Sequence, residues 1–183
     1  MRTVSFQKCH INQNQITSVN LIKTTLKMET IISKKSVSVL NTLIEINNDR
    51  IEGYHTAAKE TEEAELKSLF SDLAQTSENC NEDLIDEVNQ LGGTPTEGTR
   101  VSGKFFRAWM DDKAAITGKD RKAILNSCEY GEDVAVNTYE KVLEDDSEDL
   151  SEDQKSMVRH QHKLIKADHD KVKSLRDSLV DVE

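Results

Sequence analysis

The chain has 183 residues, 24 of them basic and 34 acidic, with a formal net charge of −10. This length suits one domain with a real core, and the negative charge disfavours a general nucleic-acid partner, because phosphate contact requires a basic face. One proline and a 32% charged fraction favour long helices over all-β folds. No segment approaches the roughly 20 apolar residues that cross a bilayer, which excludes a membrane-spanning protein.

Residues 1–35 precede the first sustained helical pattern, and residues 1–27 contain four basic and no acidic side chains. They are rich in Asn, Gln, Thr and Ser and have no apolar core like that of a secretory signal. We expect a disordered N-terminal extension over 1–35, with Met28 as an alternative start. An acid-poor transit peptide is the competing interpretation.

Apolar residues recur at alternating steps of three and four from Ser36, which predicts a helix A over about 36–59. Helix B is predicted to begin near Thr61, a candidate N-cap, and to end at Gly92-Gly93, since the following Thr94-Pro95 cannot continue a helix. The predicted buried positions are Val37, Leu40, Ile44, Asn47, Ile51, Tyr54 and Ala58 on helix A and Leu66, Phe70, Leu73, Ser77, Cys80, Leu84 and Leu91 on helix B.

A long connection, 92–119, follows helix B and is predicted to contain a short helix at about 103–116. The apolar side chains of this short helix either cover one side of the bundle or form a dimer surface; they are Phe105, Phe106, Trp109 and Met110.

Helix C is predicted over about 120–144, with Asp120 as its cap, and the acidic run 144–149 is expected to be a solvated turn. Ser151-x-x-Gln154 is a capping box that begins helix D. Helices C and D have predicted buried positions at Ile124, Leu125, Cys128, Ala135, Tyr139, Val142, Gln161, Ile165, Asp168, Val172, Leu175 and Leu179. Short A–B and C–D connections and a long B–C crossover predict an all-α, ferritin-like four-helix bundle over 36–181.

Two carboxylates, Glu132 and Asp168, fall on or near the predicted buried faces. Burying an unpaired carboxylate costs several kcal/mol, so each needs a partner or a metal. Three interpretations are open: a redox-active dinuclear metal site, a single metal site built from Glu132, Asp168 and a histidine, and a hydrogen-bond layer that fixes helix register.

A dinuclear carboxylate site requires a Glu-x-x-His pair from each of two helices, and this chain has only Glu52-x-x-His55. The candidate metal ligands are Glu52, Glu78, Glu129, Glu132, Asp168 and His169, with iron or another divalent metal as the ion. No Gly-x-Ser-x-Gly, phosphate-binding loop or dinucleotide fingerprint occurs, so a nucleophilic enzyme is not predicted, and a non-catalytic protein is favoured over an enzyme. Three cysteines without a Cys-x-x-Cys pair indicate a reducing compartment, the cytoplasm.

Several motifs follow one another along about residues 36–178. They are Leu40-Asn41-x-Leu43-Ile44-Glu45, Gly53-Tyr54 with Ala57-Ala58, Leu66-Lys67-x-Leu69-Phe70, Leu91-Gly92-Gly93, Phe106-Arg107-x-Trp109-Met110-Asp111, Cys128-Glu129-x-Gly131-Glu132-Asp133, Ala167-Asp168-His169-Asp170 and Leu175-Arg176-Asp177. In this order they resemble a bacterial ferritin-like four-helix-bundle family described as a domain of unknown function. The resemblance implies a small cytoplasmic bundle, a dimer or larger assembly, with no agreed activity.

Three functional hypotheses follow from the residues and the resemblance. The leading one is a non-catalytic, stress-associated cytoplasmic protein that acts by self-assembly or through a protein partner. The rival is a metal-binding or iron-handling protein that uses the candidate ligands above. The third, a DNA-protecting protein, depends on the basic segment 1–27.

Overall fold

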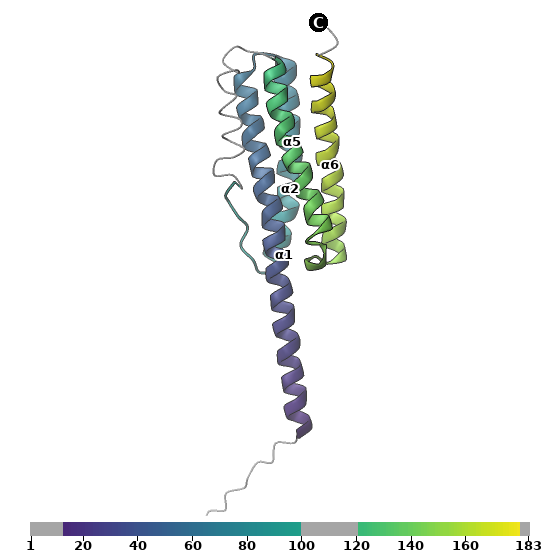
Figure 1. Ribbon diagram of the computed structural model, residues 1–183. Coiled ribbons are helices and arrows are strands. Elements are labelled where there is room, and N and C mark those ends of the chain that lie inside the picture. Colours follow the sequence, from purple (N-terminus) through teal and green to yellow (C-terminus); the bar gives the residue numbers. More distant parts are fainter. Residues whose placement is uncertain (1–12, 100–120, 180–183) are drawn as a thin grey trace, which may run out of the picture.

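The computed structural model describes residues 13–99 and 121–179, and within these ranges every regular element is helical (Figure 1). Four long helices lie in these ranges: α1 (Gln13–Glu60), α2 (Ala64–Gln90), α5 (Arg121–Glu144) and α6 (Glu152–Asp177). A 3₁₀ turn, η1 (Ser147–Asp149), joins the last two. The predicted all-α four-helix bundle is confirmed.

The four helices are arranged as two antiparallel pairs, α1 with α2 and α5 with α6, and α1 also packs against α5. The apolar core forms two clusters along the bundle. One contains Leu40, Ile44, Leu84, Tyr139 and Ile165, and the other contains Tyr54, Phe70, Ile124, Leu125 and Val172. On α1 the polar residues Asn47 and Arg50 fall between these two clusters, and this is where the candidate site lies.

The C-terminal end of α2 is fixed by the predicted pair of glycines. Gly92 has a φ of +71°, its N–H donates to the Asn89 carbonyl at 2.9 Å, and the Gly93 N–H donates to the Val88 carbonyl at 2.9 Å. This hydrogen-bond pattern is a Schellman motif, which favours glycine at the left-handed position. A Cβ on Gly93 would lie 2.6 Å from Val37, so this glycine also allows the chain to approach α1 closely.

The predicted capping box at the start of α6 is also present. The Ser151 hydroxyl accepts a hydrogen bond from the Gln154 N–H at 3.2 Å, and the Gln154 side chain accepts one from the Ser151 N–H at 2.8 Å. The start of α2 differs from the prediction, because its N-cap is Glu63 and not Thr61. The Thr61 hydroxyl instead accepts a hydrogen bond from the Glu63 N–H at 3.2 Å and shapes the turn before the helix.

The N-terminal boundary of α1 is the largest difference from the sequence prediction. The expected helix A began at residue 36 and 1–35 was expected to be disordered, whereas α1 runs without interruption from Gln13. Residues 13–52 contain neither glycine nor proline, so nothing in this stretch terminates the helix. In Figure 1 the N-terminal part of α1 projects beyond the end of the bundle at which α5 and α6 are joined. Among the described residues no helix has an apolar stretch long enough to cross a bilayer.

The first residues of the crossover lie along α1. The Asn41 and Asn48 side chains donate to the carbonyls of Thr94 and Gly98 at 3.0 and 2.9 Å. The predicted short helix at 103–116 and the predicted cap Asp120 lie outside the described residues, as do the apolar side chains at 105–110.

Candidate functional site

The centre of the bundle contains a buried arginine that the sequence analysis did not predict to be buried. Arg50 lies on α1 three residues after Asn47 and four before Tyr54, so the three side chains share one helix face. Arg50 is 2% exposed. A buried guanidinium has five N–H groups to satisfy, and the structure must therefore supply acceptors from the other helices.

Each of the other three helices contributes an acceptor to Arg50. From α5, Glu132 Oε1 accepts from Nη2 at 2.6 Å and from Nε at 3.3 Å. From α6, Asp168 Oδ2 accepts from Nη2 at 3.2 Å, and from α2 the Ser77 hydroxyl accepts from Nη1. We call these residues, together with Tyr54, the ionic layer. It connects all four helices through one cation.

Tyr54 completes the ionic layer by binding the same oxygen of Glu132 that Arg50 binds. Its hydroxyl donates to Glu132 Oε1, its ring stacks on Phe70 with centroids 5.7 Å apart, and the Arg50 guanidinium lies 5.6 Å from the Tyr54 ring centroid. Burial, and then the negative charge of Glu132, raise the pKa of Tyr54 well above its ordinary value. The phenol is therefore a neutral hydrogen-bond donor.

The charges of the ionic layer are set by burial and by mutual attraction. Burial lowers the pKa of Arg50, but the acidic groups around it, Glu132 first, and the hydrogen bond to Glu132 together outweigh burial, so the pKa of Arg50 is raised overall. Burial raises the pKa of Asp168, and the nearby Arg50 limits that rise. Arg50 is thus a permanent cation at neutral pH, held between two carboxyl groups.

A second polar set, here called the amide layer, lies next to the ionic layer in the core. Asn47 Nδ2 donates to the Tyr139 hydroxyl at 2.8 Å, and this hydroxyl donates to Gln161 Oε1 at 3.1 Å. Gln161 Nε2 donates to the carbonyl of Cys80 at 3.0 Å. This layer also draws one residue from each helix, so it fixes helix register without any net charge.

The structure brings two of the six predicted metal ligands to the same group. Glu132 and Asp168 both bind Arg50, and their shared partner is a protein cation. Glu129 forms an ion pair with Arg176. His169 contacts Asp133 and Asp170, each at 2.9 Å.

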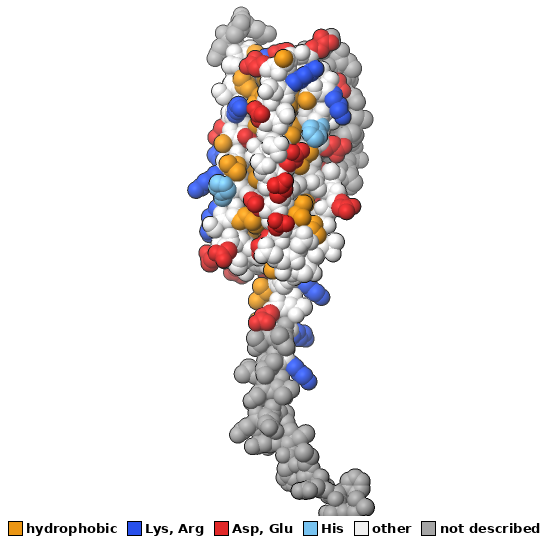
Figure 2. Space-filling model, turned by 180° about the vertical axis from the view of Figure 1, so that it is seen from behind, with side chains coloured by type: hydrophobic (Ala, Val, Ile, Leu, Met, Phe, Trp, Pro, Cys, Tyr) orange, Lys and Arg blue, Asp and Glu red, His pale blue; other side chains and the backbone are white. Residues whose placement is uncertain are grey.

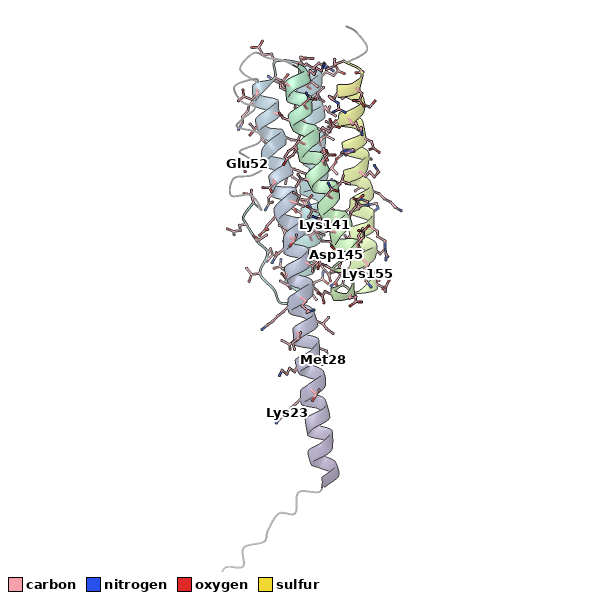
Figure 3. All side chains as sticks on the ribbon, in the orientation of Figure 1. Lys23, Met28, Glu52, Lys141, Asp145 and Lys155 are labelled. Carbon is pink, nitrogen blue, oxygen red and sulfur yellow. The ribbon has the colours of Figure 1, made fainter. Side chains whose placement is uncertain are left out.

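The other two predicted ligands lie away from the ionic layer. Glu52 is exposed and lies on the outer side of α1 (Figure 3), and Glu78 is half-buried on α2. Among the described residues no group of three or more His, Cys, Asp or Glu side chains is arranged to hold a metal ion. The arrangement therefore does not fit a dinuclear centre, because the guanidinium occupies the position between the two carboxylates.

Both functional layers contain residues that the sequence analysis missed or understated. Arg50 was omitted because charged residues are seldom fully buried, and Tyr54 and Tyr139 were treated only as apolar positions. A signal was available, since Glu132 and Asp168 needed a partner. Arg50 is a cation at helical spacing from the inward residues Asn47 and Tyr54.

Comparison with known proteins agrees with the fold. Residues 35–145, more than half of the chain, match the family model described as "Domain of unknown function (DUF2383)". No match was found among curated proteins.

Two similar solved structures are ferritin-like. A bacterioferritin from Desulfovibrio desulfuricans, described with a diiron site, has a TM-score of 0.70 at 16% identity, covering 84% of this chain and 85% of its own. A ferritin-like, diiron-carboxylate protein from Bacillus anthracis has a TM-score of 0.57 at 16% identity, covering 79% of this chain and 97% of its own. At this identity the likeness shows the fold alone.

Proposed function

The chain belongs to the DUF2383 family, and from that premise we propose that it is a non-catalytic ferritin-like bundle that acts by self-assembly. In this proposal the ionic layer is structural. The observation that carries it is the position of Arg50, whose guanidinium binds Glu132 and Asp168, the two carboxylates that the sequence predicts to face inward. A protein cation at this place performs the charge neutralisation that a bound metal would otherwise perform.

The self-assembly part of the proposal is supported by the projecting half of α1. Three of the five exposed large hydrophobic side chains among the described residues lie on it: Met28, Ile31 and Ile32. Exposed apolar side chains grouped on one element are typical of an interaction surface. A dimer is the smallest assembly that would cover them.

Location and physiological setting are further parts of the proposal. Cys80 and Cys128 are free and buried, which supports a reducing compartment, the cytoplasm. Burial raises the pKa of Cys80 to about 11, so this thiol is a core residue and not a nucleophile. Association with a stress response is supported by the motif resemblance.

The rival function, metal binding, is supported by one specific observation. Glu132 Oε2 is buried and has no hydrogen-bond partner in the described part of the chain. A single cation that used both Glu132 and Asp168 as ligands would compete with Arg50, which already binds one oxygen of each. The positive charge of Arg50 opposes such binding, which is why we favour the structural role.

Metal retention distinguishes the two functions. The full chain is loaded with Fe²⁺ without oxygen, desalted and analysed for iron, alongside Glu132→Ala and the exposed control Glu82→Ala. We expect no stoichiometric iron in any of the three proteins and no change in melting temperature with saturating Fe²⁺, Mn²⁺ or Zn²⁺. Near-stoichiometric iron in the wild type and in Glu82→Ala, lost in Glu132→Ala, would establish the metal-binding function instead.

A further inference from the structure

The projecting part of α1 presents an apolar face that is exposed and that no other part of the described chain covers. We call residues 23–35 the arm. Met28, Ile31 and Ile32 are 57%, 45% and 52% exposed and are spaced i, i+3, i+4, so they share one helix face. A helix in water gains most of its stability from packing such a face, and an isolated helix of about this length is marginal. The arm therefore requires a partner surface.

The arm is also basic, while the end of the bundle beside it is acidic. It contains Lys23, Lys27, Lys34 and Lys35 against Glu29, and Figure 2 shows basic side chains along one edge of the projecting helix. The acidic turn, residues 144–149, exposes Glu144, Asp145, Asp146 and Glu148. Arm and turn therefore have opposite charge.

The acidic turn lies at the base of the arm. Lys35 Nζ lies 2.8 Å from Asp149 Oδ1, and the Ser36 hydroxyl donates to the Asp149 carbonyl at 2.5 Å. In Figure 3, Lys23 and Met28 lie on the projecting helix, and Asp145 lies at the end of the bundle from which it projects. Asp149, with smaller effects from Glu148 and Asp146, raises the pKa of Lys35, so the turn attracts this lysine of the arm.

We propose, resting on the self-assembly proposed above, that the arms of two copies pair antiparallel about a two-fold axis passing between residues 29 and 30. In this register Met28 of one copy faces Ile31 of the other, and the symmetry repeats the contact. Lys23 then lies level with Ser36 of the second copy, beside that copy's acidic turn. One register thus places apolar side chains at the axis and opposite charges at both ends.

A second copy fits the arm better than a nucleic acid or an anionic membrane does. Residues 28–183 carry 20 basic and 34 acidic side chains, so the bundle repels a polyanion or an anionic surface that the arm would approach. The same acidic surface attracts the arm of another copy. An isologous pair also closes on itself and leaves no unpaired apolar face.

The first test is the oligomeric state of the full chain by sedimentation equilibrium. We expect a dimer whose dissociation constant Ile31→Asp raises about a hundredfold or more, because in a two-fold symmetric dimer the substituted residue occurs in the interface twice. Leu164→Asp is the matched control: it changes an exposed leucine on α6, 40% exposed, and should leave the dimer intact. Lys23→Glu should weaken the dimer, and adding Asp146→Lys should restore it. Circular dichroism verifies that each variant keeps the bundle.

The second test addresses the antiparallel register. Met28→Cys and Ile31→Cys chains, each with Cys9→Ser, are mixed and oxidised mildly. Mixed disulfides should exceed those within either variant, because these two positions face each other only in the proposed register. A parallel pair would instead favour disulfides between identical positions.

The outcomes separate this inference from the proposed function. A dimer insensitive to Ile31→Asp, or without enriched mixed disulfides, overturns the arm pairing and leaves self-assembly in place. A wild-type monomer up to about 100 μM overturns both. A monomer that sediments with phosphatidylserine vesicles, but not after Ile31→Asp, would assign the arm to an anionic membrane and also overturn the pairing.

Discussion

Replacing Arg50 by Met tests the structural role of the ionic layer most directly. Methionine keeps much of the length and the apolar stem of arginine but removes the cation. The Arg50 and Glu132 side chains are each only 1% exposed, so the substitution leaves a carboxylate buried without its counter-charge. Breaking a buried pair from one side costs about 3–5 kcal/mol, a large fraction of the roughly 5–15 kcal/mol by which a domain is stable.

The double variant Arg50→Met/Glu132→Leu distinguishes the effect of losing the ion pair from the effect of changing the packing of the core. Removing both charges leaves an apolar pair where the ion pair was, and such replacements are often neutral or stabilising. Tyr54 and Ser77 lose their partners in the double variant, so recovery should be partial. We expect the two substitutions to be coupled by about 2–3 kcal/mol.

Urea unfolding followed by far-UV circular dichroism measures these differences. With a slope of about 1–3 kcal/mol/M, Arg50→Met should lower the urea midpoint by about 2 M. The matched control is the exposed pair Lys166–Asp170 on α6, with side chains 51% and 57% exposed and 3.2 Å between the charged atoms. Lys166→Met should cost no more than about 0.5 kcal/mol. Equal costs for Arg50→Met and Lys166→Met, or a coupling energy near zero, would refute the reasoning.

Two further predictions concern the amide layer and the pH dependence of stability. Tyr139→Phe should lower the free energy of unfolding by about 1–3 kcal/mol, because it leaves Asn47 and Gln161 buried without the hydroxyl that joins them; an unchanged urea midpoint would contradict this. The folded protein raises the pKa of Asp168 above its ordinary 3.8, chiefly by burial, so this group contributes stability at low pH that is lost as the pH rises through the raised value. Asp168→Asn keeps an oxygen for Arg50 but does not ionise, so its stability relative to the wild type should increase as the pH rises from 3.8 to 7. The measurement is the difference between the two urea midpoints at several pH values in this range. A difference that does not change with pH would exclude the Asp168 contribution.

Local signals in the sequence were sufficient to predict the end of α2 and the start of α6. Gly92-Gly93 and the Ser151-x-x-Gln154 box each act through hydrogen bonds within a few residues, so their sequence specifies their structure. The start of α1 was not predicted. The expected boundary at residue 36 rested only on where the apolar spacing becomes regular, whereas residues 13–35 contain no glycine or proline that would end the helix.

The candidate site was predicted in part. Glu132 and Asp168 were recognised as inward carboxylates that need a partner, and the open question was whether that partner is a metal or a hydrogen-bonded protein group. In the structure that partner is Arg50, whose single guanidinium reaches carboxyl groups on two different helices. Such a contact depends on the relative rotation of α1, α5 and α6, which no local pattern encodes.

By itself, the sequence determined the helical class, the pairing of helices through short and long connections, and the presence of polar residues in the core, because apolar periodicity and turn residues act locally. Only the tertiary structure decided which polar residues meet. Arg50 and Glu132 are 82 positions apart in the chain and are joined at 2.6 Å. That contact exists because four helices pack around it, and in the described part of the chain the same packing leaves the arm outside the bundle with Met28, Ile31 and Ile32 exposed.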